Sequence, residues 1–446
     1  MVRLLILLLI LSLAAIASVW FIENDGSIVV EWMGYHIQTS VAFSVLAVFI
    51  AFVLLFAFLQ ILILIKNAPK NYQKSAKDKK KERGLTALTE GFAAIAAGDT
   101  KQAKKLVKQA NVCLGQVPAT KLLAAQAAQL DGNEDEAKVH YNAMLENKET
   151  EMIAIKGLLL QAEKDEDLQK ATFLAEKAVK AQPNSDWANS VLLRLYKITK
   201  KWEEAQEVLK KISRMKMLEP QKVKRDSAII SIAQSTQHKE QGDSDKALLF
   251  AQKAYKELPD FSPAAILCAK LQLDTNNKRK AVKTLESSWK QNANPQVAAA
   301  YMDIFSDETP EKRLKYADKL LNMQPNDINS HIVVAEAAIA ADNASKARNH
   351  LKMALNVRET SLICKMMADV ERLEEAEEES INKWLQRSQT SIAEPVWTCS
   401  KCSASQINWN SSCDNCQSFD SLKWNDNVDK MDVINPVNNA LAITES

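Results

Sequence analysis

Four of the seven cysteines lie close together near the C-terminal end of the sequence. Cys399 and Cys402 form one C-x-x-C pair, and Cys413 and Cys416 form a second pair ten residues later. Four thiolates in two such pairs suit the tetrahedral coordination of a structural zinc ion, with Zn–S bonds of about 2.3 Å. Iron is the alternative metal, because four thiolates also bind iron. A catalytic metal is disfavoured, since four protein ligands leave no open position.

A small domain must position these cysteines. We predict a compact ribbon of the rubredoxin type over residues 395–424, in which the metal supplies much of the folding free energy. Its few large apolar residues form either its own small core or a sticky patch against the last helices of the preceding domain: Trp397, Trp409, Phe419, Leu422 and Trp424. Residues 425–446 are polar and rich in Asn and Asp, so we predict a disordered tail.

The composition favours helices and gives no sign of nucleic-acid binding. The chain has 57 Lys and Arg against 55 Asp and Glu, so no strong global field attracts phosphate backbones. Only 9 Gly and 11 Pro occur in 446 residues, which is few for an enzyme built on phosphate loops and tight turns. The other three cysteines are scattered singly, which indicates reduced, buried thiols in an intracellular compartment.

A register of small residues organises the region before the ribbon. Ala103, Ala137, Ala171 and Ala205 lie 34 residues apart, and the same period recurs later in the chain. This period resembles the tetratricopeptide repeat (TPR), in which small residues let two paired helices approach closely. We therefore predict an all-α solenoid of about eight helix pairs over residues 84–390, with Arg313 as the one break. The register positions are 103, 137, 171, 205, 247, 281, 313 and 347.

Turn residues occur where this register requires them, about five residues before five of the eight register positions. Gly or Asn can adopt the left-handed conformation that ends a helix, and Asp or Asn can cap the next one. The step from Ala205 to Ala247 is longer than the others, which predicts an extended helix or loop near Pro220. The expected turns are Gly98-Asp99, Gly132-Asn133, Gly242-Asp243, Asn276-Asn277 and Asp342-Asn343.

The array shows no catalytic motif, and we predict that the protein is not an enzyme. Solenoids of this kind present a concave surface to other proteins, so we expect protein partners in the groove and no small-molecule substrate. The histidines occur singly, without a metalloprotease, hydrolase or phosphate-loop pattern around them. They are interpreted as surface or groove residues: His140, His238, His331 and His350.

Two uncharged segments near the N-terminus are long enough to span a membrane. They run from Leu4 to Ile22 and from Val41 to Ile65, and the second is followed by a basic stretch over residues 67–83. Because Lys-rich flanks stay in the cytoplasm, we predict a two-helix hairpin over residues 1–66 with both termini cytoplasmic. The alternative for the first segment is a cleaved signal peptide, with Ala15-Ile16-Ala17 as the cleavage site.

The loop between these segments, residues 23–40, faces outside in this topology. It holds acidic residues and no Lys or Arg, and its β-prone residues lie between turn signals at Gly26 and Gly34. We predict a small β-hairpin at the outer membrane surface. His36 is interpreted as an interfacial residue rather than a haem or metal ligand, because no second ligand lies nearby.

The membrane hairpin, the basic flank and the degenerate array together resemble HemY, a family of the proteobacterial inner membrane associated with haem biosynthesis. The most specific residues are Val2-Arg3-Leu4-Leu5 and the pattern Gly91…Ala93…Gly98-Asp99…Ala103…Ala110. The resemblance implies an inner-membrane scaffold or adaptor whose cytoplasmic array gathers proteins of late haem (porphyrin) synthesis. It assigns no catalytic or haem-ligating residue to this sequence.

The four-cysteine tail is similar to the tails of some alphaproteobacterial HemY-like proteins. It is also similar to the rubredoxin-like tail of LapB, a membrane-tethered TPR protein that regulates lipopolysaccharide assembly. LapB has a single membrane helix, whereas two are predicted here. An adaptor that presents an envelope enzyme to a membrane protease is therefore the alternative function. A redox enzyme that uses the cysteines is a remote third hypothesis.

Overall fold

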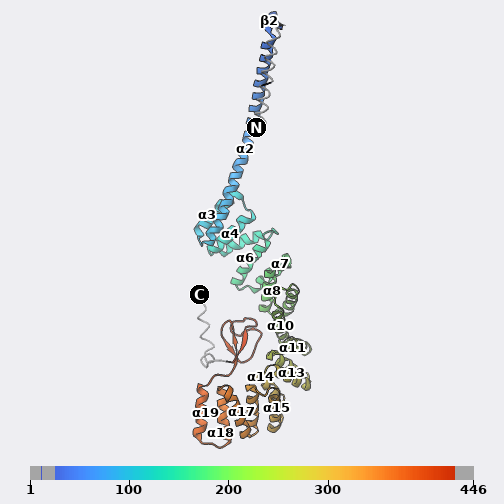
Figure 1. The fold of residues 1–446 in the computed structure, drawn as a ribbon, viewed down its shortest axis with the longest axis vertical. Coiled ribbons are helices and arrows are strands. Elements are labelled where there is room, and N and C mark those ends of the chain that lie inside the picture. Colours follow the sequence, from blue (N-terminus) through green and yellow to red (C-terminus); the bar gives the residue numbers. More distant parts are fainter. Residues whose placement is uncertain (1–11, 13–25, 427–446) are drawn as a thin grey trace. The chain divides into compact units, whose positions relative to one another are not determined.

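The computed structural model describes Ser12 and residues 26–426, and the chain divides into two compact units, residues 1–144 and 145–446. Each unit is described by itself (Figure 1). Apart from Ser12, the first predicted membrane segment lies outside the described residues. The predicted tail also lies outside them, apart from Asn425 and Asp426.

A β-hairpin begins the described part of the first unit. Strand β1 (Ser27–Trp32) pairs antiparallel with β2 (Tyr35–Ser40). The two linking residues, Met33 and Gly34, both have positive φ, of 54° and 85°. Two such residues form the type I′ turn that matches the twist of paired strands. The predicted hairpin is confirmed, and its position at a membrane surface stays a prediction.

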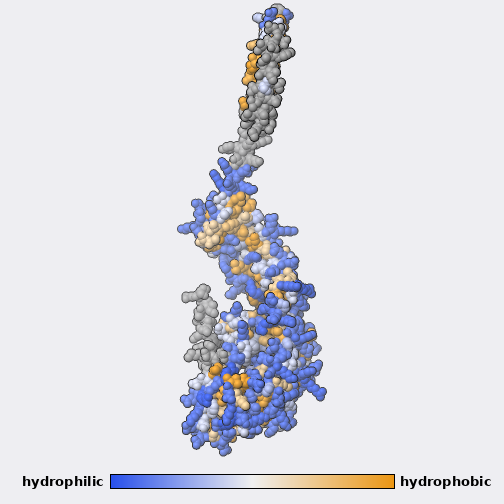
Figure 2. All heavy atoms as spheres, viewed as in Figure 1, coloured by the Kyte–Doolittle hydropathy of each residue, from blue (hydrophilic) through white to orange (hydrophobic). Residues whose placement is uncertain are grey.

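Helix α2 (Val41–Ala96) follows the hairpin directly and is 56 residues long. Its segment Phe43–Leu62 is the one described helical segment long and apolar enough to cross a membrane, and none of it is buried within the protein. Twenty residues at about 1.5 Å each match the roughly 30 Å of a bilayer's hydrocarbon core. Figure 2 shows hydrophobic residues along this part of α2.

The same helix continues without a break into the first repeat. Residues 67–83, predicted as a basic linker, lie within α2, so this connection is helical. The C-terminal end of α2 then serves as the first helix of the first pair. Gly91 packs there against Leu123. A Cβ atom at Gly91 would lie only 2.7 Å from a methyl carbon of Leu123, so a larger residue would clash. The glycine in the pattern Gly91…Ala93 is thus required by the close approach of the two helices.

Nine helix pairs follow one another in the described part of the chain, one more than the eight register positions. In each pair the first helix is called inner and the second outer. The end of α2 pairs with α3 (Thr100–Leu114). The others are α4 (Pro118–Leu130) with α5 (Glu134–Met144), α6 (Glu151–Lys164) with α7 (Leu168–Ala181), α8 (Asp186–Ile198) with α9 (Trp202–Arg214), α10 (Pro220–Glu240) with α11 (Ser244–Glu257), α12 (Ser262–Asp274) with α13 (Lys278–Gln291), α14 (Pro295–Asp303) with α15 (Pro310–Met323), α16 (Ile328–Ala340) with α17 (Ala344–Val357), and α18 (Ser361–Leu373) with α19 (Glu378–Thr390).

The alanine register lies where the paired helices pack. All seven register alanines are completely buried, as close helix packing requires. The predicted turns have the expected geometry, with positive φ at Gly98, Asn276 and Asp342 among others. Asp99 and Asp243 cap the following helices by accepting hydrogen bonds from backbone N–H groups. The turn chemistry predicted from the sequence is therefore present in the structure.

The break at Arg313 has a structural reason. The preceding helix α14 has only nine residues, so it lacks the last turn that the other inner helices have, and Arg313 is half-buried. Phe305 fills the space beyond it and stacks on Tyr316, with ring centroids 3.6 Å apart. The buried small residue is instead Ala317, one turn after Arg313. The ninth pair, α18–α19, escaped the register because Ile381 stands where the next alanine would be.

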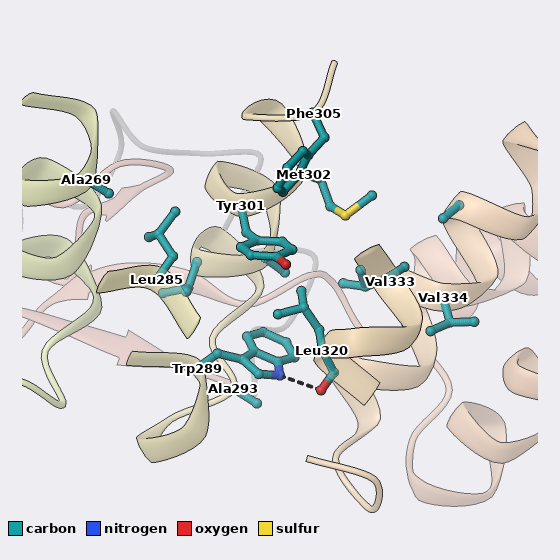
Figure 3. Packing of buried hydrophobic residues seen from close by; sticks show 14 of the residues in the cluster. Ala269, Leu285, Trp289, Ala293, Tyr301, Met302, Phe305, Leu320, Val333 and Val334 are labelled. Carbon is teal, nitrogen blue, oxygen red and sulfur yellow. Dashed lines mark hydrogen bonds between the residues drawn. The ribbon is translucent and has the colours of Figure 1, made fainter. Parts of the chain in front are cut away.

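The largest fully buried side chain described in the second unit lies in a core formed by α12 to α16 (Figure 3). Trp289 is fully buried, and its indole N–H donates a hydrogen bond to the carbonyl of Leu320, 3.0 Å away. Tyr301 packs in the same cluster and donates its hydroxyl hydrogen to Glu286. These contacts connect α13 to the two helices that follow it.

Helix α10 is the extended element predicted near Pro220. It has 21 residues, against 13 in α12, the next inner helix. The additional residues amount to about two turns. Pro220 occupies the first helical position, where its missing N–H has no consequence. These added turns carry Arg225, which binds the C-terminal ribbon.

Candidate metal centre and its docking surface

The predicted ribbon is a three-stranded antiparallel sheet. Its strands are β3 (Val396–Cys399), β4 (Ser405–Gln406) and β5 (Leu422–Asn425), in the order β4-β3-β5. Trp397 and Leu422 are buried in its small core together with two of the cysteines. The sheet places Cys399 at the end of its central strand.

Two equivalent turns present the four thiols. In the first, the N–H of Ser403 donates to the carbonyl of Cys399 at 2.9 Å. In the second, the N–H of Gln417 donates to the carbonyl of Cys413 at the same distance. Ser403 and Gln417 both have positive φ, of 59° and 55°. The two C-x-x-C pairs therefore adopt the same loop conformation.

The sulfur positions fit a single tetrahedral ion. All four Sγ atoms lie within 4.8 Å of one another. The Sγ atoms of Cys399 and Cys416 are 3.6 Å apart, and those of Cys402 and Cys413 are 3.7 Å apart. Tetrahedral zinc with bonds of about 2.3 Å requires sulfur separations of about 3.8 Å. The four cysteines could hold a metal ion, and their assignment as its ligands remains a prediction.

The surroundings of the thiols differ from one another. Burial raises the pKa of Cys413 to about 12. Burial also acts most strongly on Cys399, but hydrogen bonds with Ser421 and with the backbone of the turn outweigh it and lower its pKa to about 6. The N–H of Lys401 provides one of these bonds, 3.4 Å from Cys399 Sγ. Metal ions bind cysteine as the thiolate, so a bound cation would favour the deprotonated form of all four cysteines, including Cys413.

The other three cysteines do not join this cluster. Cys268 and Cys364 are buried within the array, and Cys113 is half-buried. None of the seven forms a disulfide, and all seven lie in the described ranges. Burial raises the pKa of Cys268 to about 11, which suits an inert packing residue.

The ribbon packs against the middle of the array, between α8 and α14 (Figure 1). A bidentate ion pair joins Arg225, in the added turns of α10, to Asp420 of the ribbon. The Nε and Nη2 atoms of Arg225 lie 2.7 and 2.8 Å from the two carboxylate oxygens. The side chain of Asp420 is only 5% exposed. Arg225 belongs to the basic run Lys222-Val223-Lys224-Arg225, whose partner the sequence did not indicate.

Aromatic contacts extend this docking surface. The ring of Phe261, the residue before α12, meets Trp397 and Trp409 edge-on at 6.2 and 5.1 Å. Trp202 lies 6.0 Å from Phe419 in the same interface. These contacts correct the expectation of a patch against the last repeats. The aromatic side chains of the ribbon instead divide between its own core and a surface of the middle repeats that extends from α9 to α12.

The last repeats contact the residues at both ends of the ribbon. Arg358 donates to the carbonyl of Asp426 at 2.7 Å, and Thr360 forms a backbone bridge with Ile392. Between these ends, Gln296 of α14 accepts a hydrogen bond from the Trp397 indole. The ribbon thus links the end of the array to its middle.

A substitution at Asp420 should loosen the ribbon without removing its metal site. Asp420→Asn keeps the shape but removes the charge that faces Arg225, at an expected cost of about 1–3 kcal/mol in docking. We expect faster amide hydrogen exchange in residues 220–233 of α10, with unchanged metal content. Lys224→Ala is the matched control, because Lys224 is an exposed member of the same basic run. Equal exchange in both variants would show that the ion pair does not hold the ribbon.

Two histidines that the sequence suggested were isolated are in contact. The Nδ1 atoms of His331, in α16, and His350, in α17, lie 2.9 Å apart. Burial lowers the pKa of both, and the neighbouring His331 and Lys346 lower that of His350 further. Asp327 and Asp318 act in the opposite direction on His331 and His350, respectively. One neutral ring donates to the other, so protonation of both rings would break this hydrogen bond.

The histidine pair should make the last repeats less stable in acid. Both pKa values are lowered from the usual 6.5, so the unfolded chain binds more protons than the folded one. The neutral histidine pair contributes its full stabilisation of the folded repeats above about pH 6.5. This stabilisation is lost as the pH falls through the lowered pKa values of the folded state. We expect hydrogen exchange of α16 and α17 to rise between about pH 7.5 and pH 5, after correction for intrinsic rates. His350→Gln should flatten this dependence, and an unchanged slope in that variant would contradict the assignment.

Two parts of the chain match known families. Residues 26–132 match the family described as the HemY protein N-terminus. Residues 239–302 match the tetratricopeptide repeat. Residues 26–132 are therefore similar to the HemY N-terminus, and residues 239–302 are similar to tetratricopeptide repeats. The first match covers the β-hairpin, α2, α3 and α4, and the resemblance inferred from the sequence is confirmed for these residues.

One relative is similar over nearly the whole chain. It is named "Probable magnetosome protein Mms48", from Magnetospirillum gryphiswaldense, and is 23% identical over 447 residues. The alignment covers 98% of this chain and 96% of the relative.

Solved structures show only distant likenesses. The Naa15/Naa10 complex bound to HypK-THB matches with a TM-score of 0.40 and 14% identity, covering 73% of this chain and 55% of that chain. YrrB, described as a TPR protein with an unusual peptide-binding site, matches with a TM-score of 0.27 and 15% identity, covering 43% and 95%. Scores this low carry no information about partners.

Proposed function

We propose that the protein is a membrane-anchored scaffold whose cytoplasmic array gathers proteins of late haem synthesis at the bacterial inner membrane. The match of residues 26–132 to the HemY N-terminus carries this proposal. That match includes the apolar segment Phe43–Leu62 and the first repeat, which share the single helix α2. The Lys-rich stretch after the apolar segment favours a cytoplasmic array and, with the predicted first span, a two-pass anchor.

Within this proposal the ribbon is structural and holds zinc. Tetrahedral sulfur coordination and an intracellular array favour zinc over iron. Four cysteine ligands around one ion would leave no position for a substrate, so the proposal assigns no catalysis to the chain. The repeats would supply the activity, as a surface on which other proteins assemble.

Crosslinking in native membranes tests this function. Photo-reactive residues at Gln237 and Lys270, on the inner helices α10 and α12, should capture neighbouring proteins that mass spectrometry can identify. We expect at least one enzyme of late haem synthesis among them, and altered porphyrin pools when the gene is deleted. The absence of such an enzyme, with unchanged porphyrins, would refute the haem assignment.

The docked ribbon favours a second candidate. A four-cysteine ribbon joined to a TPR array is the feature that resembles LapB, and here it packs directly on the inner helices. The second proposal is an adaptor that presents an envelope enzyme to a membrane protease. Accumulation of a lipopolysaccharide enzyme on deletion, with normal porphyrins, would support it over the haem scaffold.

The magnetosome relative supports the proposed architecture, but it favours neither of the two proposed sets of partner proteins. Similarity of 23% along both chains is compatible with a shared anchor and array. A shared partner would require similar surface residues in the groove, which this level of identity does not establish.

A further inference from the structure

A cleft of about 860 Å³ lies between the ribbon and the inner helices α10, α12 and α14. The helices form its floor and one wall, and the ribbon loop of residues 408–417 forms the opposite wall. Its volume is within the range of binding pockets in proteins. Neither the ribbon nor the array contains this site alone.

The floor of the cleft is apolar and built from small or branched side chains. Ile232 and Ala233 of α10 are buried there, and Ile266 of α12 is half-buried beside them. The ribbon wall is polar instead, with the carboxamide of Asn408 and the hydroxyl of Ser411 among its groups. An occupant must therefore offer both apolar side chains and hydrogen-bonding groups.

This combination suits an extended polypeptide better than a helix. A helix satisfies its backbone N–H and C=O groups internally, so a polar wall would gain little from it. An extended segment exposes these groups on both sides and alternates its side chains between opposite faces. One face could pack on Ile232 and Ala233 while the backbone bonds to side chains such as Asn408 and Gln237.

Charged residues around the cleft indicate the sign of the net charge that an occupant should carry. Glu240, Lys270 and Asp303 stand near the C-terminal ends of three successive inner helices and are exposed. The ion pairs found among residues 26–426 include none of these three. With Asp414 and Lys200, the cleft has three carboxylates against two ammonium groups. A segment with a net positive charge complements this rim.

The metal site builds one wall of the cleft. Asp414 lies between the ligand candidates Cys413 and Cys416, and Gln417 follows them directly, and both line the cleft. Trp409 also lines it and packs on Phe261. A ribbon this small depends on its metal for folding, so the wall exists only when the metal is bound.

We propose that this cleft docks an extended, net basic segment of a partner protein, and that binding requires the metal in the ribbon. The inference rests on the proposed scaffold function and names the site and the class of segment that it takes. It concerns one composite cleft rather than the concave surface as a whole.

Panning tests this directly. The probe is a phage-displayed library of random short peptides, applied to the full-length, metal-loaded protein in nanodiscs. We expect selected peptides to be rich in Lys or Arg and to bind in an extended conformation by NMR. The double variant Glu240→Lys, Asp303→Lys reverses two negative charges of the rim and should weaken peptide binding about tenfold. Glu336→Lys, on the next inner helix but outside the cleft, is the matched control and should leave affinity unchanged.

Three results would overturn the proposal. They are selection of no peptide above background, binding as a helix, and equal effects of the cleft reversals and Glu336→Lys. Removal of the metal from the wild type should abolish binding, and retained binding would refute the metal requirement. The scaffold function itself fails separately, if crosslinking in membranes recovers no partner anywhere on the array.

Discussion

Replacing Cys413 by serine is expected to empty the metal site and unfold the ribbon while the helical array stays folded. Cys413 is fully buried and its sulfur lies 3.7 Å from that of Cys402. Structural zinc contributes about 10–16 kcal/mol of apparent binding free energy in small domains, and this binding is coupled to their folding. The ribbon buries only a few apolar residues, including Trp397 and Leu422, so we expect no other interaction to compensate.

Mass spectrometry of the metal and hydrogen exchange together measure this effect. Wild type should carry about one ion per chain, and Cys413→Ser almost none. Exchange should become fast in residues 396–425 and should also rise in α10, which loses its ribbon contact at Arg225. Cys113→Ser is the control, because Cys113 lies outside the cluster. Full metal content in Cys413→Ser would show that the ion binds elsewhere.

Replacing Trp289 by alanine is expected to cost about 3–5 kcal/mol in the stability of the repeats around α13 to α16. The side chain is fully buried and packs in the cluster that contains Tyr301 (Figure 3). Its removal leaves a large cavity and an unsatisfied carbonyl at Leu320. Because repeats contact mainly their neighbours, the loss should concentrate locally rather than spread along the array.

Two further variants separate packing from hydrogen bonding. Trp289→Phe keeps an aromatic ring but loses the hydrogen-bond donor to the Leu320 carbonyl. We therefore expect it to lower the free energy of unfolding by about 1–3 kcal/mol. Trp187→Ala removes a half-buried tryptophan whose ring faces Lys156, at a cost of about 1 kcal/mol. Denaturant titration and hydrogen exchange of α13 and α15 measure these changes. If Trp289→Ala were no more destabilising than Trp187→Ala, the assigned core would be wrong.

The array could be predicted in detail because its determinants are local. An alanine at the place of closest helix approach, such as Ala281, recurs with each repeat, and a turn such as Gly98-Asp99 needs only its own residues. The prediction of helix pairs and linkers was less accurate where a repeat or a connection lacked these residues. Ile381 concealed the ninth pair, and the helical link through residues 67–83 left no distinct sequence pattern.

The four cysteines were predictable for the same reason, since each C-x-x-C pair forms a turn from consecutive residues. The histidine pair was not. His331 and His350 lie on different helices, and their spacing follows the geometry of one repeat rather than a ligand motif. Their contact depends on the packing angle between α16 and α17, which the residue types alone do not encode.

The sequence by itself determined eight of the nine described helix pairs, an apolar segment that includes Phe43–Leu62, and the grouping of the four thiols, because periodicity and spacing act over a few turns of chain. Only the tertiary structure decided where the ribbon lies. Arg225 and Asp420 are 195 positions apart, and no spacing rule connects them. Their contact depends on the length of α10, on the packing of successive repeats and on the folded ribbon. The cleft beside it has the same origin, because surfaces from distant parts of the chain meet there.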